Sequence, residues 1–144
     1  MKKLTFLACL MAIAFSSFAK EVNEEVLKVF NHTFPDAQRV SWSEEKESYL
    51  VFFTKKDISY RVVYDKEGNV VLAFKYYGED NLPPVLLNKV KKAYPEYAVH
   101  SVIEKSSDNA IEYHITMETD KKLLNLKADM LGTLTVESKY NKAE

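Results

Sequence analysis

The chain has 144 residues, of which 28% are charged and 47% hydrophobic, with a formal net charge of −1 and a single cysteine. Such a near-neutral balance lacks the basic surface that binding to a nucleic acid requires, and one cysteine excludes an intramolecular disulfide. The length fits one ordinary globular domain.

The N-terminus has the pattern of a secretory signal peptide. A short basic stretch precedes an apolar run over residues 4–15, and Ser17 and Ala19 occupy the −3 and −1 positions of a cleavage site after Ala19. The apolar run is too short to cross a bilayer. We therefore expect a signal peptide over 1–19 and a mature chain over 20–144 that is periplasmic or secreted and does not remain in the membrane.

Cleavage at this position changes the composition of the remaining chain. Cys9 is removed, and so are two of the 20 Lys and Arg residues but none of the 21 Asp and Glu residues, which gives a net charge of −3. The mature chain of about 125 residues can bury roughly two thirds of its unfolded surface. We expect a compact domain that is stabilised by its apolar core and has no disulfide.

The first half of the mature chain predicts one helix followed by four strands. Apolar residues recur at helical spacing over 22–33, with Asn23 as N-cap, and the helix should end before Pro35. β-Branched and aromatic residues predict strands over 38–42, 48–55, 58–65 and 70–77. A turn at residues 56–57 and a glycine-containing loop at 65–69 should join the last three strands as hairpins.

The second half predicts the same order of elements. Its helix opens at Pro83-Pro84 and ends before Pro95, and the predicted strands are 99–104, 111–119, 122–129 and 133–140. Several residues recur at a constant offset: Asp65, Gly68 and Lys75-Tyr76 match Asp129, Gly132 and Lys139-Tyr140. The second copy has four extra residues around 105–109, which we expect in its first hairpin loop. The prediction is an α+β fold of two tandem α-β-β-β-β repeats, at about 20–80 and 81–144, with both helices on one face of an antiparallel sheet.

Alternation along the strands assigns their two faces. The face expected to pack on the helices is mostly apolar in both halves: Tyr49, Val51, Phe53, Tyr60, Val62, Tyr64, Val70 and Leu72, matched by Tyr113, Ile115, Met117, Leu124, Leu126, Ala128, Leu134 and Val136. The opposite face is polar in the second half. In the first half it is mainly apolar with a basic margin, and it comprises Leu50, Phe52, Arg61, Val63, Val71, Ala73 and Lys75.

This apolar face is the predicted binding site, because an exposed apolar patch with a charged rim usually marks an interaction surface. The alternative is that the same chain covers it, either with the tail after Tyr140 or with the connection at 78–82.

The doubled unit of helix, aromatic-Pro pair and strands, together with the Asp-x-x-Gly hairpin, resembles the PepSY-like, β-lactamase-inhibitor-like proteins exported by Bacteroidetes. The resemblance covers essentially the whole mature chain. It implies a curved antiparallel sheet with helices on the convex side and an open concave face, which in the β-lactamase inhibitor grips a protein. No inhibitory loop and none of that inhibitor's disulfides can be recognised here, so inhibition of β-lactamase is not part of the expectation.

No catalytic or metal-binding pattern stands out. His32, His100 and His114 lack the spacing of metal ligands, and no serine or cysteine nucleophile motif is present. The single tryptophan, Trp42, is expected in the core. We therefore predict no enzymatic activity, no metal and no cofactor.

The leading functional hypothesis is a non-catalytic exported binding or inhibitor-type module that acts on an unidentified protein or peptide through the open sheet face. One alternative is a structural or envelope-stress protein that assembles with itself, for example as a homodimer. Another is a carrier of a small ligand.

Overall fold

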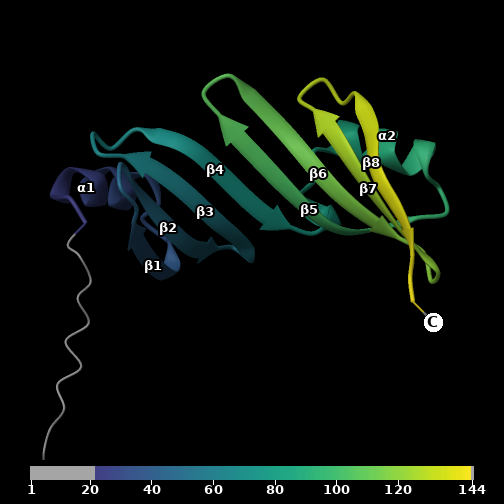
Figure 1. Cartoon of the computed structure of the whole chain (residues 1–144), viewed down its shortest axis with the longest axis horizontal. Helices are drawn as coiled ribbons and strands as arrows, with labels where there is room; N and C mark the ends of the chain where they lie inside the picture. Colours follow the sequence, from purple (N-terminus) through teal and green to yellow (C-terminus); the bar gives the residue numbers. More distant parts are fainter. Residues whose placement is uncertain (1–21, 144) are drawn as a thin grey trace, which may run out of the picture.

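The computed structural model describes residues 22–143, so the predicted signal peptide lies outside the described residues. The elements follow in the order α1 (Glu24–Thr33), β1 (Gln38–Glu44), β2 (Ser48–Lys55), β3 (Ile58–Asp65), β4 (Val70–Tyr77), η1 (Glu79–Asn81), α2 (Pro84–Ala93), β5 (Ala98–Ser107), β6 (Ala110–Glu118), β7 (Lys122–Asp129) and β8 (Leu134–Asn141). The eight strands form one antiparallel sheet in sequence order, and α1 and α2 lie at its two ends (Figure 1). The α+β class is confirmed, while the division into two repeats stays a prediction.

Helix α1 begins and ends where its sequence predicts. The Asn23 side chain accepts a hydrogen bond from the backbone N–H of Glu25 at 2.9 Å, so it is the N-cap. The helix ends at Thr33, and Phe34, which precedes Pro35, is its C-cap. Helix α2 opens with proline and likewise ends just before an aromatic-Pro pair.

The hairpin turns take the geometry that their residues favour. Lys56 and Asp57 both have positive φ, 48° and 63°, as the two central residues of a type I′ turn require. In the next hairpin Asp65 Oδ1 accepts backbone hydrogen bonds from Glu67 and Asn69. Asp129 makes the equivalent pair of bonds in the β7–β8 hairpin. Both aspartates thus hold their turns through hydrogen bonds from the backbone.

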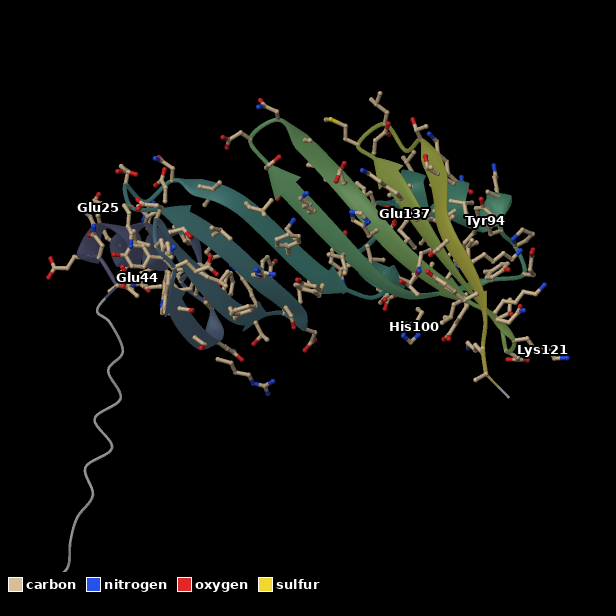
Figure 2. All side chains as sticks on the ribbon, viewed as in Figure 1. Glu25, Glu44, Tyr94, His100, Lys121 and Glu137 are labelled. Carbon is tan, nitrogen blue, oxygen red and sulfur yellow. The ribbon has the colours of Figure 1, made fainter. Side chains whose placement is uncertain are left out.

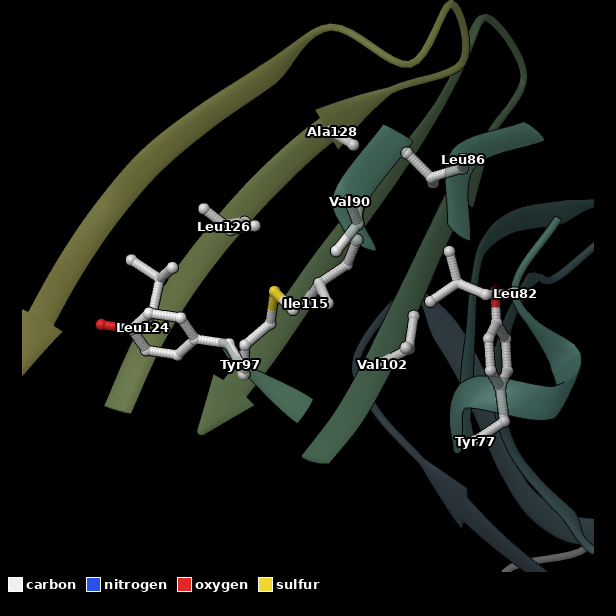
Figure 3. Close-up of a cluster of buried hydrophobic side chains, with 11 residues drawn as sticks. Tyr77, Leu82, Leu86, Val90, Tyr97, Val102, Ile115, Leu124, Leu126 and Ala128 are labelled. Carbon is white, nitrogen blue, oxygen red and sulfur yellow. The ribbon is translucent and has the colours of Figure 1, made fainter. Parts of the chain in front are cut away.

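The apolar residues divide into two cores on the helix-covered side of the sheet. The first core packs α1 against β2 and β3 and comprises Val26, Phe30, Tyr49, Val51, Phe53, Val62 and Tyr64. The second packs α2 against β5, β6 and β7, and Figure 3 shows most of its side chains, among them Leu86, Val90, Ile115, Leu124 and Leu126. Trp42 is partly buried and packs edge-on against Phe30 at 5.1 Å between ring centroids, so it lies at the margin of the first core.

The four extra residues of the second half do not enlarge a hairpin loop, so that prediction is wrong. The β5–β6 turn has two residues, 108–109, and β5 is ten residues long. The added length provides Lys105 and Ser106 as partners of Phe74 and Ala73 on β4. The extra residues therefore lengthen the β4–β5 pairing that joins the two halves into one continuous sheet.

Strand β4 departs from the predicted alternation. Val63 pairs with Leu72 and Tyr64 with Val70, so Val71 is an extra residue between two ladder positions, a β-bulge. A bulge shifts every later residue to the opposite face relative to strict alternation. The prediction that Val70 and Leu72 lie in the core is wrong: Val70 is 40% exposed, and Leu72 lies beside Val63 on the open face.

Candidate functional site: the open sheet face

The side of the sheet opposite the helices carries an apolar cluster over its first half. Strand register places Phe52 beside Arg61 and Arg61 beside Phe74, across β2, β3 and β4. The neighbouring rows add further apolar residues. We call the whole set the open-face patch, and it comprises Leu50, Phe52, Arg61, Val63, Leu72, Phe74, Tyr76 and Ile103.

Arg61 lies at the centre of this patch between two phenyl rings. Its Cζ is 5.8 Å from the ring centroid of Phe52 and 5.4 Å from that of Phe74, within the range of cation–π attraction. Its Nε is buried and has no hydrogen-bond partner. No carboxylate in the described part of the chain pairs with it. The two rings thus orient the guanidinium group, which makes no ion pair within the described residues.

Two of the predicted site residues lie on the other face. Ala73 pairs with Val62 and packs against the first core, and Lys75 pairs with Tyr60. The bulge at Val71 is the reason, because the prediction assumed unbroken alternation along β4. Val71 itself is 49% exposed. The positions predicted on β2 and β3 are correctly placed on the open face.

Lys75 instead belongs to a polar network on the helix-covered side, where β4 meets β5. Its Nζ lies 2.6 Å from Glu104 Oε1, and the hydroxyl of Tyr77 donates to Glu104 Oε2 at 2.7 Å. Burial and this hydrogen bond to the carboxylate raise the pKa of Tyr77 above its usual range. The network joins the two halves of the sheet and leaves Lys75 unavailable to the open face.

Four members of the patch were not predicted there: Leu72, Phe74, Tyr76 and Ile103. Leu72 was expected in the core with Val70. Phe74 and Tyr76 continue the same period-two alternation, but no face was predicted for them. No feature of the sequence marks the bulge that reverses it. Phe74 is the most consequential omission because it supplies one of the two rings on Arg61.

The patch is partly accessible. Phe52 is 44% exposed and Tyr76 36% exposed, whereas Leu50 is only 7% exposed, so Leu50 lines the floor of the patch. The connection at 78–82 does not cover it, because Leu82 is buried in the second core on the opposite side. Tyr140 pairs with Leu123 at the far edge of the sheet. Neither intrachain cover that we considered is therefore present in the described residues.

The second half of the same face is polar, and many of its side chains form hydrogen bonds and ion pairs with one another. Thr116 donates to Asn125, whose amide donates in turn to Ser138, at 3.0 and 2.9 Å. Lys127 pairs with Glu112 at 2.6 Å, and this hydrogen bond lowers the pKa of the carboxyl and raises that of the lysine.

The histidines of this half also pair with carboxylates. His114 lies 3.2 Å from Glu137, and His100 lies 3.0 Å from Glu118. Figure 2 shows His100 and Glu137 over this half of the sheet. The two halves thus present opposite surfaces, one polar and internally paired, the other apolar with an unpaired cation.

Other surface features of the described residues lie outside the patch. Among residues 22–143 no group of three or more histidine, cysteine or acidic side chains could hold a metal ion. A hollow of about 450 Å³ at the end of the first strands is lined by polar residues such as Gln38, Thr54 and Ser59. No helix in the described range is long and apolar enough to span a membrane.

Comparison with known proteins gives a match in structure alone. No protein-family model and no curated protein matches the sequence. A solved BLIP-like protein from Bacteroides fragilis superimposes with a TM-score of 0.64 and 19% identity, covering 86% of this chain and 90% of its own. The fold is that of the BLIP-like proteins of Bacteroides.

Two further solved structures have the same fold. A DUF2874 family protein from Bacteroides ovatus matches with a TM-score of 0.61 and 19% identity over 84% of this chain and 88% of its own. A protein from Bacteroides eggerthii, described as a proposed periplasmic protein, matches with a TM-score of 0.60 and 16% identity over 84% and 89%. None of these descriptions names an enzyme, and the PepSY-like part of the predicted resemblance stays a prediction.

Proposed function

We propose that the mature protein is a non-catalytic, exported binding module that holds a protein or peptide on the open-face patch. The observation that carries this proposal is the contrast between the two halves of one sheet face. The second half pairs its polar groups internally, whereas the first half leaves apolar side chains and Arg61 without cover. Since the scaffold tolerates a polar face in this position, folding alone does not require the apolar one.

Export to the periplasm is part of the proposal. The N-terminal pattern of a basic stretch, an apolar run and small residues at −3 and −1 supports it. The description of the Bacteroides eggerthii neighbour supports the same compartment. Recovering the mature chain from a periplasmic fraction and measuring its intact mass tests this, and a chain that still begins at Met1 would contradict it.

Binding through the patch is tested with variants of residues 20–144. Phe52→Asp and Val63→Lys introduce charge into the patch, and Thr135→Asp is the matched control on the polar half of the same face. We expect all three to melt near the wild-type temperature. Partners captured from a periplasmic extract and identified by mass spectrometry should be lost with the first two variants and retained with the control. Unfolding of both patch variants would mean that the face is core.

A second candidate is self-assembly, favoured by the exposed apolar residues of β8. Val136 is 50% exposed and Tyr140 57% exposed, and β8 is an edge strand that can pair with another chain. Light scattering on the purified mature protein separates the two candidates. A self-assembling protein would have the molar mass of a dimer without any partner, and Tyr140→Lys should lower that mass to that of a monomer.

A further inference from the structure

We infer that Arg61 recognises a carboxylate, so the partner of the open-face patch presents an aspartate or glutamate side chain beside apolar residues. This inference rests on the proposed binding function and specifies the chemistry of its partner. It follows from three features of Arg61: its orientation, its unpaired nitrogen and its uncharged surroundings.

The orientation of the guanidinium is set by two rings. Phe52 and Phe74 lie on either side of it, at 5.8 and 5.4 Å from Cζ to each ring centroid. A guanidinium is planar, weakly hydrated and able to stack on aromatic faces while its edge still donates to a carboxylate in bidentate geometry. Because the rings restrict the side chain beforehand, less conformational freedom is lost when a carboxylate binds.

The hydrogen bonding of Arg61 is incomplete within the chain. Its Nε is buried and has no acceptor within the chain, so no internal carboxylate or carbonyl satisfies that side of the guanidinium. The matching position in the second half is Asn125, which both donates and accepts across its strand neighbours. A polar side chain at this position of the sheet can therefore find its hydrogen-bond partners within the chain. The Nε of Arg61 does not.

The surroundings of Arg61 also contain no competing anion. Lys75 and Lys127 each contact a glutamate at 2.6 Å, whereas no ion pair joins Arg61 to any described carboxylate. Its directly paired neighbours are phenylalanines. The diagonal positions on the adjacent strands are uncharged, and they are Leu50, Thr54, Leu72 and Tyr76. The positive charge is thus available to an anion that comes from outside.

The same surroundings favour a peptide segment over a free anion. Apolar side chains lie near Arg61 on both sides. Val63 and Leu72 lie on one side, and Tyr76 and then Ile103 on the other, where Ser59 and Thr54 lie as well. A small carboxylate would neutralise the charge but leave these side chains exposed to water. A segment with an acidic residue next to apolar residues covers both, because it pairs the charge and buries the patch together.

The test is selection of peptides of random sequence, displayed on phage, against the mature protein. Peptides that bind wild type should be enriched in Asp and Glu adjacent to an apolar residue. With Arg61→Met, which keeps the unbranched apolar stem without the charge, the acidic enrichment should disappear and the apolar preference should remain. The affinity of the strongest synthetic peptide should fall about 10- to 100-fold. Arg61→Lys should restore only part of it, since a lysine has no bidentate fork.

A double-mutant cycle assigns the contact to Arg61. The selected peptide is also made with its acidic residue replaced by Asn or Gln, and both peptides are titrated against wild type and Arg61→Met. Non-additive losses support a direct pair, and additive losses overturn this inference.

Two other outcomes separate this inference from the proposed function. Peptides that bind wild type without acidic enrichment overturn the role of Arg61 and leave the binding face intact. If no peptide is enriched, or if the enriched peptides bind Phe52→Asp as well as wild type, the proposed function itself falls. Melting curves of each variant establish that the protein remains folded.

Discussion

Phe52 and Phe53 are adjacent in the sequence and lie on opposite faces of β2, so truncating each one separately measures what each face contributes. Phe53 is 2% exposed and contacts three aromatic rings of the first core, Phe30, Phe34 and Tyr60, at centroid distances of 5.2, 4.7 and 4.8 Å. Phe53→Ala removes all three contacts and leaves a cavity. Replacements of this kind cost about 3–5 kcal/mol of unfolding free energy.

The expected shift in melting temperature follows from the size of the domain. For a chain of this length 1 kcal/mol corresponds to roughly 3–5 °C, so Phe53→Ala should lower the melting temperature by about 10–25 °C. A typical domain has about 5–15 kcal/mol of stability, so the variant should still fold at low temperature. Phe52 is 44% exposed and contacts Arg61. Phe52→Ala should cost only about 1 kcal/mol, or less than about 5 °C.

Thermal unfolding followed by circular dichroism, together with urea titration at 25 °C, compares the two variants. The reasoning is refuted if Phe52→Ala is as destabilising as Phe53→Ala, because the assignment of the two faces of β2 would then be reversed.

Three further changes test other parts of the structure. Tyr64→Phe removes a buried hydroxyl that has no hydrogen-bond partner, so it should raise the stability by about 1 kcal/mol in urea titrations. Burial raises the pKa of Tyr64 to about 12, so wild type should lose stability as the pH rises from 10 to 12, and the variant should lose less. Hydrogen bonds from Asn69 hold the pKa of Asp65 below its ordinary value. The unfolded chain therefore binds this proton more readily, stability falls as the pH drops below about 4, and Asp65→Asn should flatten that part of the pH profile. Gly68 has φ +87°, so Gly68→Ala should cost about 1–2 kcal/mol, and Gly68→Asn less.

Periodic patterns predicted most of the fold. Helical spacing and the proline after each aromatic residue located both helices, and period-two alternation located the strands and most of the core, including Val51, Phe53, Ile115 and Met117. These features are local, because they depend on side chains that repeat along one element. Turn chemistry was equally local, and the positive φ of Lys56 and Asp57 followed from a two-residue hairpin.

Features that depend on strand pairing could not be predicted in the same way. The bulge at Val71 is visible only in the pairing of β4 with β3, and nothing in the order of apolar residues records it. It moved Ala73 and Lys75 to the helix-covered face and Phe74 to the open one. The full length of the β4–β5 pairing was not predicted for the same reason, because the extra residues of the second half resembled a loop insertion.

The β4–β5 strand pair, which joins the two halves of the sheet, has a further consequence for how the protein unfolds. Each helix packs against its own core. The two cores are joined by the β4–β5 strand pair, by the contacts of Glu104 with Lys75 and Tyr77, and by the packing of Tyr77 and Ile58 in the second core. A protein arranged in this way has two cooperative units that share one boundary. Local opening at that boundary would separate the units, leave the first core intact and remove Tyr77 and Ile58 from the second. Amide hydrogen exchange should then be slowest in β2–β3 and in β6–β7 and faster in the β4–β5 pair.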